Sequence, residues 1–331
     1  MHIGYLGPLT GAISYYRGLG PLTRFAKETH YELINITGDG DLWERLRGID
    51  VIYSIREIED ESIELYRMAK KLGIKIIFDI DDDLLNIPIE HSAFPHYARK
   101  NVRHNIQEAL TLANVVITST HDLKESLYRQ HPRQYEVVNN AVDEKFFKLH
   151  KHPWQGQHGI AWRGSDTHDF DIRTMATPLL KFVNETPGME LHLWGYYSWS
   201  LIRETTNSVH YHGTQEFLKY MLSFIETRPK VVIVPLADNQ FNRSKSNIAW
   251  IEATQAGAVT IAPRFPEFMR PGVFTYENQR EFLDHLITVF SEPETVQRAY
   301  SASLADVESN YTLLTKNIER YKIIKELLHE C

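Results

Sequence analysis

The sequence predicts an α/β protein with two Rossmann-like domains that face a central cleft. Short apolar runs alternate with longer segments of helical spacing, which is the pattern of a parallel sheet covered on both faces. This alternation stops between residues 139 and 158 and then restarts, and a length of 331 residues is typical of about two domains. We therefore expect an N-terminal domain over residues 1–145 and a second domain over residues 156–305.

Apolar runs and helical periodicity predict the elements of the first domain in order. The predicted strands are Ile3–Leu6, Tyr31–Ile36, Val51–Ile55, Lys75–Phe78, Val115–Thr118 and Glu136–Val138. The predicted helices are Leu19–Thr29, Glu61–Gly73 and Val102–Ala113. The following residues, Asn139 to His158, show little periodicity and are expected to form a linker.

The second domain repeats this alternation and ends in a long helical stretch. Its predicted strands are Gly159–Trp162, Met189–Trp194, Val209–His212, Val231–Pro235, Val259–Ala262 and Val273–Tyr276. Its predicted helices are Ile172–Thr186, Gln215–Ile225, Asn247–Ala256 and Glu281–Ser291. Residues 296–328 are expected to be helical throughout, with a break near Asn310.

Composition and charge exclude several classes of protein. An apolar fraction of 43% and a charged fraction of 24% argue against a disordered chain or a coiled coil. With 36 basic and 43 acidic residues the net charge is −7, which is not that of a general nucleic-acid binder. The single cysteine, Cys331, favours a reducing, cytoplasmic location, and we expect neither a secretory leader nor a membrane span.

A glycine-containing loop follows the first predicted strand. Residues 7–18 include Gly11 and Arg17, and a loop of this kind between a strand and a helix can hold a phosphate on its backbone N–H groups. It matches neither a dinucleotide fingerprint nor a Walker loop, so an ordinary tight turn is the alternative.

An acidic cluster follows the fourth predicted strand. Four carboxylates lie within five residues, from Asp79 to Asp83. They could form a solvated loop with a helix cap, a clamp for a hard cation, or a polar cluster that holds acceptor hydroxyls or a positively charged transition state. Because the cluster follows an apolar strand, we expect it to lie at the cleft.

The first loop of the second domain offers a cation and a histidine. Arg163 and Gly164 follow the first predicted strand there, and Arg163 with the small residues after it could hold a phosphate at a helix start. His168 could serve as a general acid, although a lone histidine is more often an ordinary packed or surface residue.

The segment Val231–Val259 carries the strongest signal. An apolar strand ends at Pro235, a polar loop with Arg243 and Lys245 follows, and a helix is expected to begin near Ser246 and Asn247. Two cations beside a helix N-terminus form a diphosphate site, and Glu252 within that helix could accept hydrogen bonds from a ribose diol. The alternative is a capped strand–helix unit with a surface pair of cations.

These motifs together resemble a known family. The residues from Asn242 to Glu252, followed by Gly257, are similar to the donor-binding segment of GT-B glycosyltransferases of the retaining type often called family 4 or group 1. The segments Gly7–Gly20, Val138–Asp143 and Ile160–Asp171 resemble the N-terminal loop, the end of the first domain and the opening of the second domain in that group.

The resemblance implies a nucleotide-sugar donor that is bound mainly by the second domain. Arg163 and Lys245 would neutralise its diphosphate, and Glu252 would hold its ribose. It also implies transfer with retention, no cofactor and no required metal. The C-terminal helix, residues 306–331, would cross back onto the N-terminal domain. By the same resemblance, Gly11, Arg17, Gly164, His168, Arg243, Ser246 and Asn247 are the further donor-binding candidates.

Two departures from the family pattern concern the donor site. The common pair of glutamates eight residues apart keeps only Glu252, because Ser244 stands at the earlier position. Asn140 replaces the usual glycine after Asn139, and asparagine also tolerates a left-handed backbone. The first departure puts a direct carboxylate contact to the sugar in doubt.

The acceptor is expected on the N-terminal domain. Between His91 and Arg133 this domain has six Arg or Lys residues against three acidic ones, so the acceptor could be a polyanion such as a lipid phosphate, a glycan or DNA, with peripheral membrane contact. The alternative is the ordinary solvated surface of an amphipathic helix. Asp83, Arg99 and Arg103 are the candidate acceptor contacts, and Asp81 and Asp82 are catalytic candidates. A phage-type DNA glycosyltransferase and a non-catalytic nucleotide-sugar-binding protein remain alternatives, whereas the missing glycine fingerprint disfavours an NAD-dependent oxidoreductase.

Overall fold

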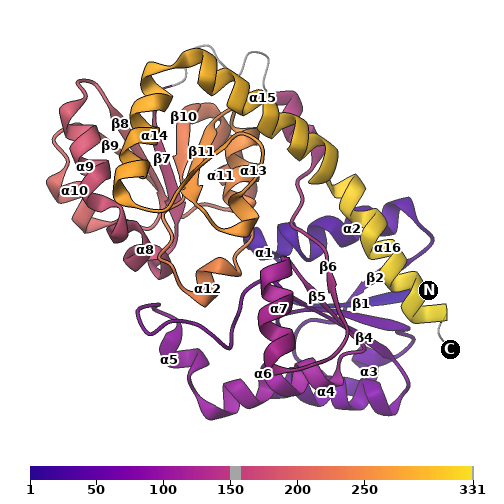
Figure 1. The fold of residues 1–331 in the computed structure, drawn as a ribbon. Coiled ribbons are helices and arrows are strands. Elements are labelled where there is room, and N and C mark those ends of the chain that lie inside the picture. Colours follow the sequence, from indigo (N-terminus) through magenta and orange to yellow (C-terminus); the bar gives the residue numbers. More distant parts are fainter. Residues whose placement is uncertain (150–157, 330–331) are drawn as a thin grey trace.

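The computed structural model describes residues 1–149 and 158–329, and it contains two six-stranded sheets in two lobes (Figure 1). All strand pairs in both sheets are parallel. The strand order is β2-β1-β3-β4-β5-β6 in the first sheet and β12-β11-β10-β7-β8-β9 in the second. The predicted two-domain α/β class is thereby confirmed. Of the predicted linker, residues 150–157 lie outside the described residues.

The elements of the first domain alternate as the apolar periodicity predicts. Its strands are β1 His2–Leu6, β2 Glu32–Asn35, β3 Val51–Ile55, β4 Lys75–Ile80, β5 Val115–Thr118 and β6 Tyr135–Val137. Its helices are α1 Gly11–Tyr16, α2 Leu19–Glu28, α3 Leu42–Leu46, α4 Asp60–Lys71, α5 Phe94–Tyr97, α6 Lys100–Leu112 and α7 His121–Gln130. A short 3₁₀ turn, Glu144–Leu149, ends this part of the chain.

The second domain repeats the arrangement. Its strands are β7 His158–Gly164, β8 Glu190–Gly195, β9 Ser208–Gly213, β10 Pro229–Ile233, β11 Val259–Pro263 and β12 Val273–Tyr276. Its helices are α8 Asp169–Thr174, α9 Ala176–Glu185, α10 Trp199–Glu204, α11 Phe217–Thr227, α12 Gln240–Arg243, α13 Ile248–Gln255 and α14 Gln279–Ser291, followed by α15 Pro293–Asn310 and α16 Leu313–His329.

Successive residues of β4 pack against opposite layers of helices, which explains why the three residues from Ile76 to Phe78 are all apolar and buried. Ile76 and Phe78 belong to the core that lies against α4 and α6. Ile77, between them, belongs to the core that contains α2 and α16. The side-chain period of two therefore buries every position of a strand that is covered on both faces.

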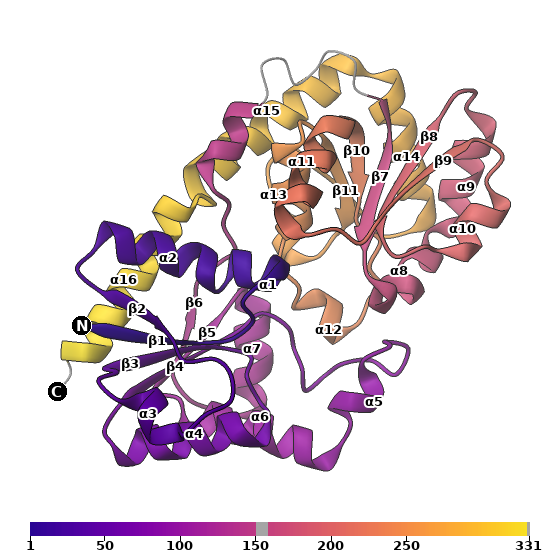
Figure 2. The same ribbon diagram turned by 180° about the vertical axis from the view of Figure 1, so that it is seen from behind.

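The last two helices return from the second domain to the first (Figures 1 and 2). Helix α15 packs on α13 and α14, whereas Ile324 and Leu327 of α16 enter the core of the first sheet. The Asn317 side chain also donates a 3.1 Å hydrogen bond to the Pro21 carbonyl. The break between the two helices lies at Tyr311 and Thr312, close to the predicted break at Asn310.

Several local elements differ from the predictions. Helix α7 was not predicted, although Thr120 caps it by accepting a 3.0 Å hydrogen bond from the Leu123 amide. The predicted polar loop around Arg243 contains the short helix α12, and the next helix begins at Ile248, two residues after Ser246. The helix predicted over Ile172–Thr186 is divided at Met175 into α8 and α9.

A buried ion pair joins α1 to the first sheet. Arg17 follows α1 and is fully buried, with its Nη2 atom 2.8 Å from an oxygen of Asp79 in β4. The other Asp79 oxygen accepts a 2.7 Å hydrogen bond from Tyr53 in β3. Arg17 also donates to the Val138 carbonyl and to the Asn140 side chain. Arg17 thus connects the loop after β1, two strands and the segment after β6.

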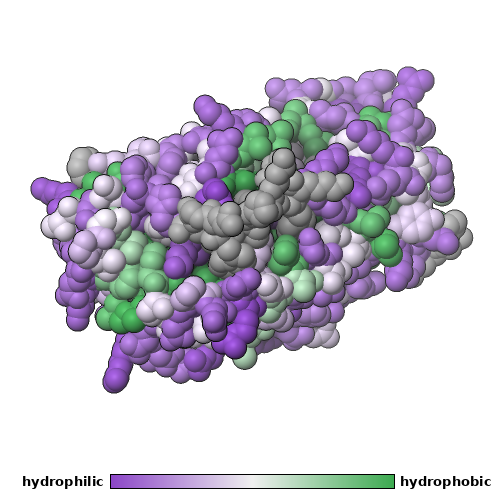
Figure 3. Space-filling model, turned by 90° about the horizontal axis from the view of Figure 1, so that it is seen from above, coloured by the Kyte–Doolittle hydropathy of each residue, from purple (hydrophilic) through white to green (hydrophobic). Residues whose placement is uncertain are grey.

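The surface of the molecule is mainly polar on the face seen from above, with small separate apolar patches (Figure 3). Among the described residues, no helix has the length and apolar character needed to cross a membrane.

The buried Arg17–Asp79 pair predicts a loss in the free energy of unfolding when Asp79 is replaced. Replacing Asp79 with Asn leaves a buried guanidinium without its counter-charge, so we expect a loss of about 3–5 kcal/mol in the free energy of unfolding. Urea denaturation of D79N and wild type measures this loss. Glu108→Gln is the matched control, because the Arg67–Glu108 pair is also close, at 2.7 Å, but is exposed on the Arg67 side and should contribute much less to stability. Equal losses in the two variants would contradict the prediction.

Candidate active site

A cavity of about 200 Å³ lies between the two domains. It is bordered on the N-terminal side by Asp81 and Asp82, which follow β4, and on the other side by Arg163, His168 and Lys245. Arg163 lies near the end of β7 and Lys245 lies between α12 and α13. Because the carboxyl ends of parallel strands meet at one edge of each sheet, both domains present loops to this cavity, as the sequence predicts.

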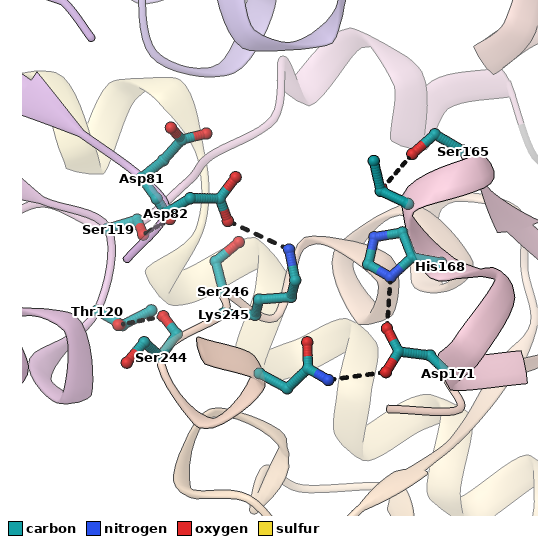
Figure 4. Close-up of polar contacts among 12 residues, drawn as sticks. Asp81, Asp82, Ser119, Thr120, Ser165, His168, Asp171, Ser244, Lys245 and Ser246 are labelled. Atoms are coloured by element: carbon teal, nitrogen blue, oxygen red, sulfur yellow. Dashed lines mark hydrogen bonds and ion pairs between the residues drawn. The ribbon is translucent and has the colours of Figure 1, made fainter. Parts of the chain in front are cut away.

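Lys245 reaches across the cavity to the N-terminal domain (Figure 4). Its Nζ atom lies 3.2 Å from Oδ1 of Asp82 and 4.4 Å from the centre of the Phe241 ring. Burial alone would raise the pKa of Asp82, but the positive charges of Lys245 and Arg56 outweigh it and lower the pKa to about 2. Asp82 is therefore ionised at neutral pH and neutralises Lys245.

Arg163 has a carboxylate partner within its own domain. Its Nε atom lies 2.8 Å from Oε2 of Glu252, and the Glu252 side chain is only 3% exposed. The Nη2 atom of Arg163 is buried and has no hydrogen-bond acceptor among the residues that the structure describes. A buried guanidinium N–H without an acceptor is costly, so this atom offers a donor to an anion in the cavity.

Two tyrosines complete the surroundings of Glu252. Tyr16, from α1 of the N-terminal domain, donates a 2.6 Å hydrogen bond to Oε1, and Tyr220 of α11 donates a 2.9 Å hydrogen bond to Oε2. Burial beside the carboxylate raises the pKa of both phenols well above the usual value, so they remain protonated donors. The predicted ribose-binding carboxylate is thus occupied in this structure by protein groups, one of which comes from the opposite domain.

His168 is held in place by Asp171. Its Nδ1 atom lies 2.8 Å from Oδ2 of Asp171 (Figure 4). The Oδ1 atom of Asp171 accepts hydrogen bonds from the Asn242 side chain at 2.8 Å and from the Ala237 amide at 2.9 Å. Burial lowers the pKa of His168 despite this carboxylate, and Lys245 lowers it further. The histidine is therefore neutral at pH 7. With its Nδ1 proton directed to Asp171, Nε2 is an acceptor at the cavity.

Uncharged contacts also cross between the domains beside the cavity. Thr120 donates a 2.8 Å hydrogen bond to the Ser244 carbonyl, and the Asn140 amide donates one of 2.8 Å to the hydroxyl of Ser246. Phe241 of α12 packs within the apolar core of the N-terminal domain. The two domains are therefore in direct contact along one side of the cavity.

The acidic cluster from Asp79 to Asp83, at the end of β4, is divided among separate partners. Asp79 pairs with Arg17, and Arg56 lies 3.1 Å from both Asp81 and Asp82. Burial raises the pKa of the Asp81 carboxyl, whereas its neighbour Asp82 is stabilised in the charged form. Each of these three carboxylates has a cationic partner. Of the alternatives for this cluster, the solvated loop is therefore wrong.

Several predicted donor contacts lie outside this cavity. Arg17 is buried against Asp79, and Arg243 forms a two-point ion pair with Asp238 at 2.6 and 2.7 Å and borders a neighbouring cavity. Gly11 and Gly164 border another neighbouring pocket, where a Cβ at residue 164 would lie 2.6 Å from the Trp162 ring. Asn247 is buried just before α13.

The predicted acceptor contacts are also dispersed. Asp83 is fully buried and accepts hydrogen bonds from Ser126 at 2.6 Å and Asn86 at 2.9 Å. Arg103 donates a 3.0 Å hydrogen bond to the Leu85 carbonyl, and Arg99 is exposed at the start of α6. The structure therefore does not bring these three side chains together.

Four residues that shape the cavity or its charges are not among the sequence-predicted site residues. Tyr16 and Tyr220 act through contacts between distant segments, for which a single sequence gives no signal. Arg56 has a left-handed backbone, with φ of 52°, directly after β3. Its position after a strand that neighbours β4 could have suggested a partner for the acidic cluster. Asp171, three residues after His168, could have been recognised as its helical neighbour.

The chain is similar to known proteins in its structure and not in its sequence. No protein-family model and no curated protein matches its sequence. Among solved structures, sucrose-phosphate synthase from Thermosynechococcus elongatus matches with a TM-score of 0.70 and 12% identity over 100% of both chains. Anabaena HepE in complex with UDP-glucose gives a TM-score of 0.68 and 13% identity over 98% of this chain and 100% of that chain.

A third structure of similar fold is named as an epimerase. UDP-GlcNAc 2-epimerase from Neisseria meningitidis, bound to UDP-GlcNAc, matches with a TM-score of 0.56 and 13% identity over 100% of both chains. At these identities the matches show architecture, and one architecture supports more than one activity. The chain has the GT-B fold.

Proposed function

We propose that the protein is a glycosyltransferase that moves a sugar from a nucleoside diphosphate to an acceptor hydroxyl. The observation that carries the proposal is the shared cavity between the domains, in which Arg163 and Lys245 border the same space beside Glu252. This arrangement was expected from the sequence because these residue types form diphosphate sites. The solved structures with the same fold include a sucrose-phosphate synthase and a complex with UDP-glucose, which supports the same chemistry.

The cations of the cavity would stabilise the leaving group. As the bond between the sugar and the diphosphate breaks, negative charge develops on the phosphate oxygens, and pre-placed cations lower the energy of that state. Arg163 already offers a buried N–H that has no acceptor among the described residues. Lys245 would exchange its contact with Asp82 for one with a phosphate oxygen.

Glu252 would hold the ribose of the donor after a rearrangement. Its Oε1 atom is occupied by Tyr16 of the opposite domain. If the domains move apart to admit the nucleotide, this oxygen is released and can accept a hydrogen bond from a ribose hydroxyl. Subsequent closure would exclude water and limit hydrolysis of the donor.

The acceptor would enter from the N-terminal side of the cavity, where Asp81 and Asp82 lie. Both carboxylates are paired with cations, so neither is a free general base in this closed structure. Transfer with retention of configuration is proposed from the family resemblance alone. A polyanionic acceptor, whether a glycan, a lipid phosphate or DNA, remains part of the proposal.

Replacing Lys245 with Ala tests the role of the cavity cations. Losing one charge at the leaving diphosphate should lower the transfer rate by about 100-fold or more. Arg243→Ala is the matched control, because it removes a cation two residues away that pairs with Asp238 outside the cavity. Initial rates of UDP release, with unfolding curves to show that both variants fold, measure the difference. Equal rates in K245A and wild type would contradict the proposal.

A donor and acceptor screen tests the proposed reaction itself. We expect one nucleoside diphosphate sugar, with UDP-sugars tested first, to raise the melting temperature by roughly 5 °C or more at 100 times its Kd. With that donor, an oligosaccharide, a lipid phosphate or a hydroxymethylated DNA should gain one sugar by mass spectrometry, and NMR of the product gives its anomeric configuration. Conversion of UDP-GlcNAc to an isomer without any acceptor would instead indicate an epimerase and contradict the proposal.

A further inference from the structure

In the second domain, a group of histidines surrounds one glutamate near the N-terminal ends of the strands, away from the cleft. His158 is the first residue of β7 and Glu190 is the first residue of β8, whereas the cleft lies at the opposite, carboxyl ends of these strands. Arg163 is the fifth residue after His158 in β7, which corresponds to roughly 16 Å along the strand. The diphosphate site therefore does not explain this group.

The imidazole nitrogens converge on the Glu190 carboxylate. The Nε2 atoms of His158 and His192 lie 2.8 and 3.2 Å from Oε2, and Nε2 of His210 lies 3.9 Å from Oε1. The ligand atoms of His158, Glu190 and His192 all lie within 4.8 Å of one another. Donor atoms that share one tetrahedral Zn²⁺ ion are about 3.3 Å apart, given Zn–N and Zn–O bonds of about 2.0–2.2 Å. The group is thus close to the spacing that such an ion needs.

Strand register explains why these residues meet. Residues 190 and 192 lie on one face of β8 because side chains alternate, and His192 pairs with His210 on β9. The two rings are stacked, with centres 4.7 Å apart and planes inclined by 15°. Gly159 follows His158 with φ of +76°, and a Cβ there would lie 3.2 Å from Nε2 of His192. A residue with a side chain at this position would crowd the nitrogen that faces the glutamate.

His192 also has a partner that fixes its orientation. Its side chain is only 7% exposed, and its Nδ1 atom lies 3.1 Å from Nε2 of His212. The His212 ring in turn stacks on Trp194, with centres 4.0 Å apart. When Nδ1–H of His192 donates to His212, the lone pair of Nε2 is directed toward Glu190. Metal-bound histidines are commonly oriented by a hydrogen bond at the other ring nitrogen in this way.

We propose that His158, Glu190 and His192 bind a Zn²⁺ ion, with His210 as the fourth ligand. Imidazole and carboxylate are ligands that zinc accepts, and a site with four protein ligands is structural. Such an ion would join the beginnings of β7 and β8 to the edge strand β9. It would stabilise the second domain without taking part in the transfer step, so this inference does not depend on the proposed function.

Zinc titration of the full chain tests the site. The protein is purified without a polyhistidine tag, treated with a chelator and titrated with ZnCl₂ in a calorimeter. We expect one ion per chain with a Kd of about 10 µM or lower, and a rise in the melting temperature that grows with zinc concentration. MgCl₂ is expected to give neither effect, because Mg²⁺ prefers oxygen ligands.

Substitutions locate the ion and supply the control. His192→Ala and Glu190→Gln should each weaken zinc binding by at least tenfold, and His158→Ala, at a more exposed position, provides a variant with little risk to folding. His104→Ala is the matched control, since His104 is an exposed histidine beside the single carboxylate Glu108. Zinc binding weaker than about 10 µM in the wild type, or unchanged in folded H158A and E190Q, would overturn the proposal.

Discussion

The closed arrangement of the two domains depends on neutralising two cations in the cavity between them. Lys245 and Arg163 are both largely buried, and a buried charge without a counter-charge is strongly unfavourable. In this structure Asp82 neutralises Lys245 across the domain interface, and Glu252 neutralises Arg163 within the second domain. Tyr16 then connects Glu252 to the opposite domain. The same residues that would bind a diphosphate therefore also hold the cleft closed.

Because the same cations would bind the donor and now pair with protein carboxylates, ligand binding would be coupled to domain movement. In the proposed function, a diphosphate would supply the negative charge that Asp82 supplies in its absence, so the two would compete for Lys245. Three successive residues of the N-terminal domain connect α1 to the second domain and to the first sheet. Tyr15 stacks on Phe217 of α11 with ring centres 4.2 Å apart, Tyr16 donates to Glu252, and Arg17 anchors this segment to β4. A movement of α1 would therefore displace groups at the proposed donor site and in the first sheet at the same time.

Much of the fold, and the central part of the site, could be predicted from the sequence because the relevant signals are local. Apolar runs that are buried on both faces identify the strands, and the order of strand, polar loop and helix places Lys245 and Glu252 near one point. Arg17 and Arg243 show the limit of such reasoning, because a loop arginine can serve equally well as a ligand contact or as the partner of a nearby carboxylate. Only the positions of Asp79 and Asp238 distinguish these roles, and they are fixed by tertiary structure. The histidine group around Glu190 was missed for the same reason, because three strands far apart in the sequence bring its members together.

The competition between Asp82 and a diphosphate can be measured directly. Calorimetric titration of UDP and of uridine into the wild type and into Asp82→Asn compares ligands that differ only in the diphosphate. Removing the carboxylate frees Lys245, so UDP should bind D82N more tightly than the wild type, while the affinity for uridine should stay the same. Equal or weaker binding of UDP to a folded D82N variant would contradict the account in which Lys245 exchanges an internal carboxylate for the phosphates of a donor.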